Sequence, residues 1–192
     1  MLTSPQPNYD VKAFLALDEQ TFNKRLELHG GHILELESAT PNHSVLCNTI
    51  GFILRGLYPP SSGCRVFDGS VNIYIDSEEK VVKPDAAVPC GVMQNITGIE
   101  GVGAAIQNPV IVVEVLSKDS EKYGKAEKAD LYRSLPSLEY YILISQNKME
   151  VQQYSRLGKA TWQLVTLTSE EELVRLFKES IRLADLYEGI SI

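Results

Sequence analysis

Residues 109–117 constrain the fold most strongly, because a continuous apolar run leads into one acidic residue. Residues 110–113 read Val-Ile-Val-Val, Glu114 follows, and Val115 and Leu116 continue the run. Such a run predicts a strand covered by helices on both faces. A carboxylate inside that strand loses its hydration, so Glu114 must be neutral, paired with a cation or several donors, or bound to a metal ion.

Length and composition predict a single soluble domain. The chain has 192 residues, of which 44% are hydrophobic, and this is enough for one core without disulfide or metal support. No apolar run reaches the ~20 residues that span a bilayer, and residues 1–10 lack the pattern of a secretory signal. We therefore expect one cytoplasmic domain over residues 1–192, with no membrane partner.

The cysteines and the net charge argue against two kinds of site. Cys47, Cys64 and Cys90 are scattered and form no CxxC pair, so we expect reduced thiols in the core and neither a disulfide framework nor a zinc site. The net charge of −7 argues against a broad basic face for nucleic acid. An enzyme with a small, local basic site is compatible with this charge.

Helices and strands are expected in a mixed order along the chain. Helical periodicity predicts helices over residues 10–18 and 43–57, and a third that is capped within residues 117–120 and ends near residue 135. Residues 89–108 are expected to form a long loop. Strands besides the central one are expected at residues 24–29, 32–37, 64–67, 71–75, 81–88, 138–145, 148–155 and 161–167. This order favours an α/β (mixed α+β) sheet flanked by helices over a repeating βαβ array.

Asp85 and Glu114 occupy matching places in two of the predicted strands. Pro84 cannot donate to a sheet ladder, so Asp85 is expected at a strand start or an irregular edge. If the strands are neighbours, both carboxylates can point to one side of the sheet. Carboxylate oxygens, with a backbone carbonyl and waters, suit Mg²⁺ or Mn²⁺, and such an ion promotes phosphodiester hydrolysis. The alternative is a turn residue at Asp85 and a paired carboxylate at Glu114.

Several short motifs occur in an order that extends over nearly the whole chain. They are residues 26–28 (LEL) with Gly31, residues 39–44 (ATPNHS), residues 83–85 (KPD), residues 112–117 (VVEVLS), residues 127–128 (EK) with Tyr132, and residues 140–143 (YYIL). This set resembles the Uma family of restriction-endonuclease-like proteins, within the PD-(D/E)XK nuclease superfamily. The resemblance implies a restriction endonuclease-like core and Mg²⁺- or Mn²⁺-dependent cleavage of DNA.

The resemblance also implies roles for individual residues. Asp85 and Glu114 would bind the metal, with the carbonyl of Val115 as a third ligand. The superfamily pattern has a lysine two residues after the acid, where this chain has Leu116. In the Uma-type pattern a lysine on the following helix takes that place, and Lys128 matches it, so Asp85, Glu114 and Lys128 form the expected catalytic set.

A second interpretation of the function stays open for two reasons: one departure from the family pattern, and the charged residues around Lys128. Gly124 stands where the family often has an aspartate, four residues before Lys128. The helix also carries Lys122, Lys125 and Arg133, so Lys128 could belong to a solvated face. The alternative function is a non-catalytic interaction or regulatory module that retains a nuclease-like fold.

Four further residues are expected near the metal, each with a simpler alternative. His43 could equally be a polar residue in the first turn of its helix, and Glu27 and Glu35 could be ordinary hairpin positions. Ser117 could cap the following helix. We also expect a homodimer, because cutting both strands of DNA often requires two active sites, and the C-terminal strands could supply its interface.

Overall fold

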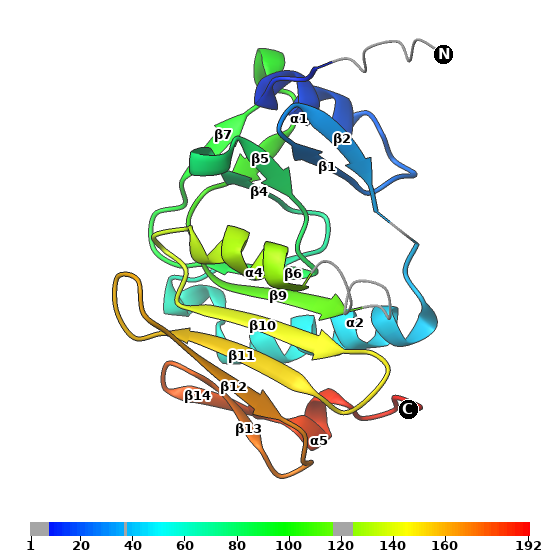
Figure 1. Cartoon of the computed structure of the whole chain (residues 1–192), viewed down its shortest axis with the longest axis vertical. Coiled ribbons are helices and arrows are strands. Elements are labelled where there is room, and N and C mark those ends of the chain that lie inside the picture. Colours follow the sequence, from blue (N-terminus) through cyan, green and yellow to red (C-terminus); the bar gives the residue numbers. More distant parts are fainter. Residues whose placement is uncertain (1–7, 37, 117–124) are drawn as a thin grey trace.

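The computed structural model describes residues 8–36, 38–116 and 125–192. Its strands form two six-stranded mixed sheets and one two-stranded hairpin, and we call the six-stranded sheets the upper and the lower sheet after their places in Figure 1. In spatial order the upper sheet contains β2 (His32–Glu35), β1 (Leu26–His29), β5 (Lys80–Val82), β4 (Asn72–Ile75), β8 (Ala104–Ile106) and β7 (Asn95–Thr97). The lower sheet contains β12 (Trp162–Leu167), β11 (Val151–Arg156), β10 (Tyr140–Ser145), β9 (Pro109–Leu116), β6 (Ala86–Pro89) and β3 (Phe67–Asp68).

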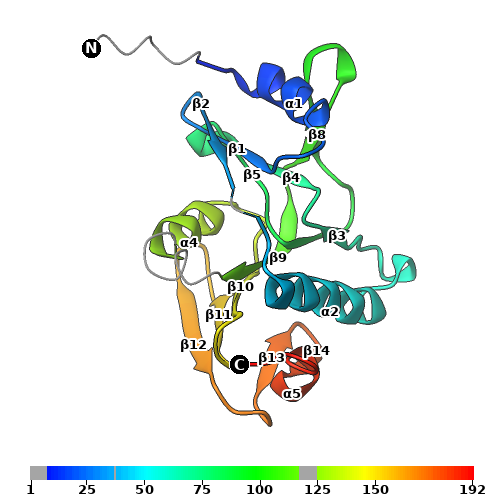
Figure 2. The ribbon, with the colours of Figure 1, turned by 90° about the vertical axis from the view of Figure 1, so that its right-hand side faces the viewer.

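Helices cover the lower sheet on both faces, as the apolar run predicts. Figure 2 shows α2 (Pro41–Leu57) and α4 (Lys125–Arg133) on opposite sides of this sheet. Val113 and Val115 of β9 pack in one core with α2, whereas Val112 and Leu116 pack in a second core with α4. Because successive side chains of a strand alternate between faces, Glu114 points to the α4 side.

The remaining elements complete the fold class predicted from the sequence. Helix α1 (Val11–Glu19) is capped by Asp10, whose carboxylate accepts from the amide of Ala13 at 2.8 Å. The helix packs on the upper sheet. The hairpin β13 (Leu173–Leu176) and β14 (Glu179–Arg182), with α5 (Leu183–Leu186), closes the core beneath α2. The mixed α+β fold is therefore confirmed. No helix in the described ranges is long and apolar enough to cross a membrane.

The predicted strand over residues 81–88 is wrong, because the chain leaves one sheet and enters the other within it. β5 ends at Val82 in the upper sheet and β6 starts at Ala86 in the lower sheet. Pro84 has no amide hydrogen to donate, which favours a break at this point. The amides on either side have partners: that of Lys83 donates to Glu27 Oε1 at 3.0 Å, and that of Asp85 donates to Val113 O at 3.0 Å.

The predicted long loop over residues 89–108 is also wrong. It contains β7 and β8, which pair with each other, and β8 runs parallel to β4. Strands of three residues are too short for periodicity to reveal. Gly103 adopts φ +74° and lies so close to α1 that a Cβ would come within 2.1 Å of Leu15 O, so a glycine is needed for this packing.

Two of the three cysteines form a disulfide, which corrects the expectation of three reduced thiols. Cys64 and Cys90 face each other across an isolated antiparallel bridge and are joined by a disulfide, whereas Cys47 is free. They are 26 residues apart, and only the pairing of segments before β3 and after β6 brings them together. Sequence spacing alone gives no sign of such a pair.

Thiol counting tests this bond. We expect one reactive thiol per chain when protein that was purified without reductant is unfolded in denaturant and titrated with a chromogenic disulfide reagent. Reduction before unfolding should raise the count to three. Three thiols without reduction would contradict the Cys64–Cys90 bond. A Cys47→Ser variant is the control, because it should remove the one thiol found under non-reducing conditions.

Candidate active site

Asp85, just before β6, and Glu114 on the adjacent strand β9 border one small cavity. β6 runs antiparallel to β9 with Ala86 opposite Val113, so Asp85, just before β6, lies beside Glu114. The two residues are 4% and 6% exposed, yet both line a cavity of about 150 Å³. The other residues that line it are Arg25, Leu36, Ser38, Ala39, Thr40, His43, Lys83, Val115 and Gln146.

Three groups hold the Asp85 carboxylate. The guanidinium of Arg25 donates to Oδ1 at 3.1 Å, and Oδ2 accepts from the amide of Val115 at 2.8 Å and lies 3.2 Å from Nε2 of His43. Burial by itself would raise the pKa of Asp85. That effect is outweighed by the hydrogen bond with His43, the charges of His43 and Arg25, and the hydrogen bond from the Val115 amide. The pKa of Asp85 is therefore held below its ordinary value, and Asp85 is ionised.

Glu114 has a different environment from Asp85. Its Oε1 accepts from Lys128 Nζ at 3.1 Å and from the hydroxyl of Tyr132 at 2.8 Å. Burial raises the pKa of Glu114 to about 7. The charge of Lys128 opposes that rise, whereas the negative charges of Asp85 and Glu27 add to it. Three carboxylates thus lie near each other, and additional positive charge would favour ionisation of Glu114.

Lys128 bridges two of the three carboxylates. Its ammonium lies 3.1 Å from Glu114 Oε1 and 3.2 Å from Glu27 Oε1, and its side chain is 25% exposed. Burial would lower the pKa of Lys128, but the charges of Glu114 and Glu27 raise it above its ordinary value. The lysine is therefore a fixed cation beside the cavity, and it does not lie on a solvated face.

The other residues expected near the metal are placed differently from one another. His43 lies in the site, and buried Glu27 (1% exposed) reaches it through Lys128. Glu27 also accepts from the Lys83 amide and contacts His29 at 2.9 Å. It therefore connects β1 to the segment between β5 and β6. Glu35 forms an exposed ion pair with Lys24 and does not line the cavity. Ser117 lies outside the described residues.

Sequence reasoning missed the role of Arg25 and the donor role of Tyr132. Arg25 precedes β1 and contacts Asp85, which is 60 positions away in the sequence. No local motif predicts such a contact. Tyr132 lies one helical turn after Lys128, so both point at Glu114 from the same face of α4. The spacing of four residues between Lys128 and Tyr132 could therefore have predicted that Tyr132 lies in the site.

Two tyrosines allow the hydroxyl contact with Glu114 to be tested. Tyr132→Phe leaves buried Oε1 without one donor and is expected to lower the free energy of unfolding by about 1–2 kcal/mol. Tyr141 packs against the Tyr132 ring, and its buried hydroxyl has no partner among the described residues. Tyr141→Phe is therefore the control and should be neutral or stabilising. Urea unfolding of both variants gives the comparison, and an equal loss in the two would refute the assignment.

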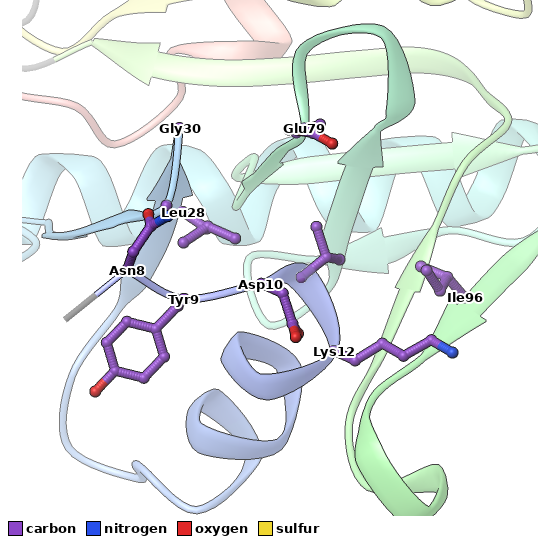
Figure 3. Close-up of a pocket in the computed structure, with 10 residues that line it drawn as sticks. Asn8, Tyr9, Asp10, Lys12, Leu28, Gly30, Glu79 and Ile96 are labelled. Carbon is purple, nitrogen blue, oxygen red and sulfur yellow. The ribbon is translucent and has the colours of Figure 1, made fainter.

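A cavity larger than the one beside Asp85 lies elsewhere among the described residues. It has a volume of about 610 Å³ and is bordered by α1, the turn between β1 and β2, and Glu79 (Figure 3). Its charged side chains are Asp10, Lys12 and Glu79, and the Asp10 carboxylate already caps α1. None of the predicted catalytic or metal-binding residues borders it, so size alone does not locate the candidate site.

Comparisons with known proteins support the resemblance found in the sequence. The chain is 29% identical to the uncharacterized protein sll1609 of Synechocystis over 160 residues, which is 82% of this chain and 86% of that protein. It is 23% identical to a second uncharacterized Synechocystis protein, slr1290, over 98% of this chain and 96% of that one. Neither name carries a function.

A solved structure shares the fold. The crystal structure of a putative nuclease of the DUF820 group from Anabaena variabilis superimposes with a TM-score of 0.67, and it covers 86% of this chain and 91% of its own. At 16% identity it shows the fold alone. Residues 11–184 match the family Uma2, which is described as "Putative restriction endonuclease". The chain therefore belongs to the Uma2 family of putative restriction endonucleases.

Proposed function

We propose that this protein is a divalent-metal-dependent endonuclease that hydrolyses DNA phosphodiester bonds. The observation that carries the proposal is the pair of buried carboxylates beside a cavity, with Asp85 just before β6 and Glu114 on the neighbouring strand β9. Family membership and the nuclease-like fold support a nuclease, and this pair supports the dependence on a metal.

The donors around the cavity suit Mg²⁺ or Mn²⁺. Asp85 and Glu114 offer hard oxygen ligands, and no described group donates to Oε2 of Glu114. The carbonyl of Val115 is the third expected ligand. Its amide points to Asp85, and the amide and carbonyl of one residue in an extended strand point to the same side. A cation here would also relieve the repulsion that raises the pKa of Glu114. When bound, the ion supplies Lewis acidity toward a phosphodiester.

The chain's own cations are placed to bind a phosphate. Lys128 is held as an ammonium by two carboxylates, so it can position an anionic group but cannot serve as a base. Arg25 and His43 border both the small cavity and an adjoining one of about 420 Å³, which also contains Arg55. These residues supply the local basic path that an acidic chain needs to bring a DNA strand to Asp85.

A cleavage assay tests the proposal. We expect supercoiled plasmid to be nicked or linearised with Mg²⁺ or Mn²⁺, but not with EDTA or by Asp85→Asn. Cleavage that is unchanged in EDTA or in the variant would refute the metal mechanism. No cleavage by the wild-type protein, together with binding of a partner protein, would favour the second candidate, the non-catalytic interaction module. Leu116 in place of the superfamily lysine and the net charge of −7 are the observations that favour it.

The proposal includes a homodimer in the cytoplasm. β12 is the outer strand of the lower sheet, and the side chains of Leu164 and Val165 on it are 50% and 38% exposed. An unpaired edge with exposed apolar side chains can pair with a second copy. Sedimentation should give twice the mass of the 21.3 kDa chain at micromolar concentration. A species of 21.3 kDa alone would exclude the dimer.

A further inference from the structure

His43 and Cys47 form a pair of potential ligands one helical turn apart on α2. Residues four positions apart lie on the same face of a helix, and this face of α2 faces the start of β6. His43 Nε2 lies 3.2 Å from Asp85 Oδ2, and Cys47 Sγ lies 3.4 Å from Nδ1 and 3.9 Å from Nε2 of His43. One ligand atom from each of these residues falls within 4.8 Å of the other two.

These separations are close to the edges of a metal tetrahedron. With a Zn–S bond of about 2.3 Å and Zn–N and Zn–O bonds of about 2.0–2.1 Å, adjacent tetrahedral ligands lie about 3.6 Å (S···N) and about 3.3 Å (N···O) apart. The observed edges from Nε2 of His43 are 3.9 Å to Cys47 Sγ and 3.2 Å to Asp85 Oδ2. The third edge, between Cys47 Sγ and a carboxylate oxygen of Asp85, lies within 4.8 Å, so the sulfur and the oxygen would approach each other around one ion.

We propose that His43, Cys47 and Asp85 bind a thiophilic divalent cation such as Zn²⁺ or Co²⁺. The donor set of one sulfur, one nitrogen and one oxygen suits these ions, whereas Mg²⁺ prefers oxygen ligands alone. All three residues border the cavity of about 420 Å³, so a fourth position around the ion would be open to water. Binding requires loss of the thiol proton of Cys47.

The proposed cation competes with the one described above, because both need Asp85. An ion held by Cys47 and His43 lies on the α2 side of Asp85, whereas Glu114 points to the α4 side of the sheet. The thiophilic ion would therefore withdraw Asp85 from the pair with Glu114. The simpler reading of the same contacts is a hydrogen-bond chain, in which the thiol donates to Nδ1 and Nε2–H donates to Asp85.

Cobalt spectroscopy separates the two readings. The wild-type protein with an intact disulfide should bind one Co²⁺ per chain and show the thiolate-to-cobalt charge-transfer band. Cys47→Ser should abolish that band and weaken Co²⁺ binding at least about tenfold. Glu114→Gln should retain the band while losing cleavage, which distinguishes this site from the proposed nuclease centre. Absence of the band in the wild-type protein, or its persistence in Cys47→Ser, would overturn the proposal.

Alkylation provides a second readout that does not depend on a variant folding. Zn²⁺ should protect Cys47 of the wild-type protein from iodoacetamide, with the modified cysteine located by peptide mapping. Mg²⁺ at the same concentration is the control and should give no protection. An alkylation rate of Cys47 that Zn²⁺ leaves unchanged would contradict a thiolate–metal bond.

Discussion

Glu114→Gln is expected to reduce Mg²⁺- or Mn²⁺-dependent cleavage at least about 100-fold while the chain remains folded. The substitution preserves the size of the side chain and an oxygen that can accept from Tyr132, but it removes the negative charge that a cation needs. Loss of about 3 kcal/mol of transition-state stabilisation corresponds to this factor. Initial rates of plasmid nicking give the ratio, and circular dichroism reports the fold.

The control for Glu114→Gln lies on the helix that faces it. Asp130 is on α4 and pairs with Arg133 at the surface, where its own side chain is 74% exposed, so Asp130→Asn changes the charge by the same amount away from the cavity. Its cleavage rate should stay within a factor of two of wild type. Equal cleavage by wild type and Glu114→Gln would show that Glu114 is a structural carboxylate.

Lys128→Met is expected to have the largest effect on stability. It removes the ammonium shared by Glu27 and Glu114, and the two buried carboxylates then lose the cation between them. Removing one partner of a buried pair costs about 3–5 kcal/mol, and the partial exposure of Lys128 favours the lower end of that range. Urea unfolding measures the change, and cleavage should fall with it because the cation that we propose to bind the phosphate is lost.

A second substitution separates charge from packing at Lys128. Glu27→Gln in the Lys128→Met background removes one of the two carboxylates that shared the ammonium and should recover part of the lost stability. Lys24→Met is the matched control, since Lys24 pairs with Glu35 at the surface with both side chains about half exposed. That variant should change the free energy of unfolding by less than about 1 kcal/mol. Equal losses in the two lysine variants would contradict the buried bridge.

The sequence predicted those parts of the site that depend on local pattern. The apolar run around Glu114 identified a covered central strand, since β9 lies between α2 and α4. Asp85 was correctly expected beside it, because the proline before it marks where the chain enters the sheet. The family resemblance, not the helical spacing, indicated Lys128, and its ammonium does lie beside Glu114 and Glu27. Its catalytic role stays a prediction.

The parts that the sequence did not predict arise from contacts between distant segments. Arg25 lies 60 positions from Asp85 and Cys90 lies 26 positions from Cys64, and neither residue carries a local signal of its partner. β7 and β8 are too short for their alternation to stand out. The break after β5 involves Glu27, whose side chain accepts a hydrogen bond from the Lys83 amide. That amide would otherwise be free to extend β5. The hydrophobic pattern within residues 81–88 gives no sign of that hydrogen bond.

Calorimetric titration with Mn²⁺ tests most directly the central claim that Asp85 and Glu114 bind a metal together. It needs no assumption about which DNA is cut. We predict one saturable Mn²⁺ site per chain in the wild-type protein, abolished by Asp85→Ala and by Glu114→Gln but retained by Cys47→Ser. Absence of binding in the wild-type protein, or binding that survives both carboxylate substitutions, would contradict the claim.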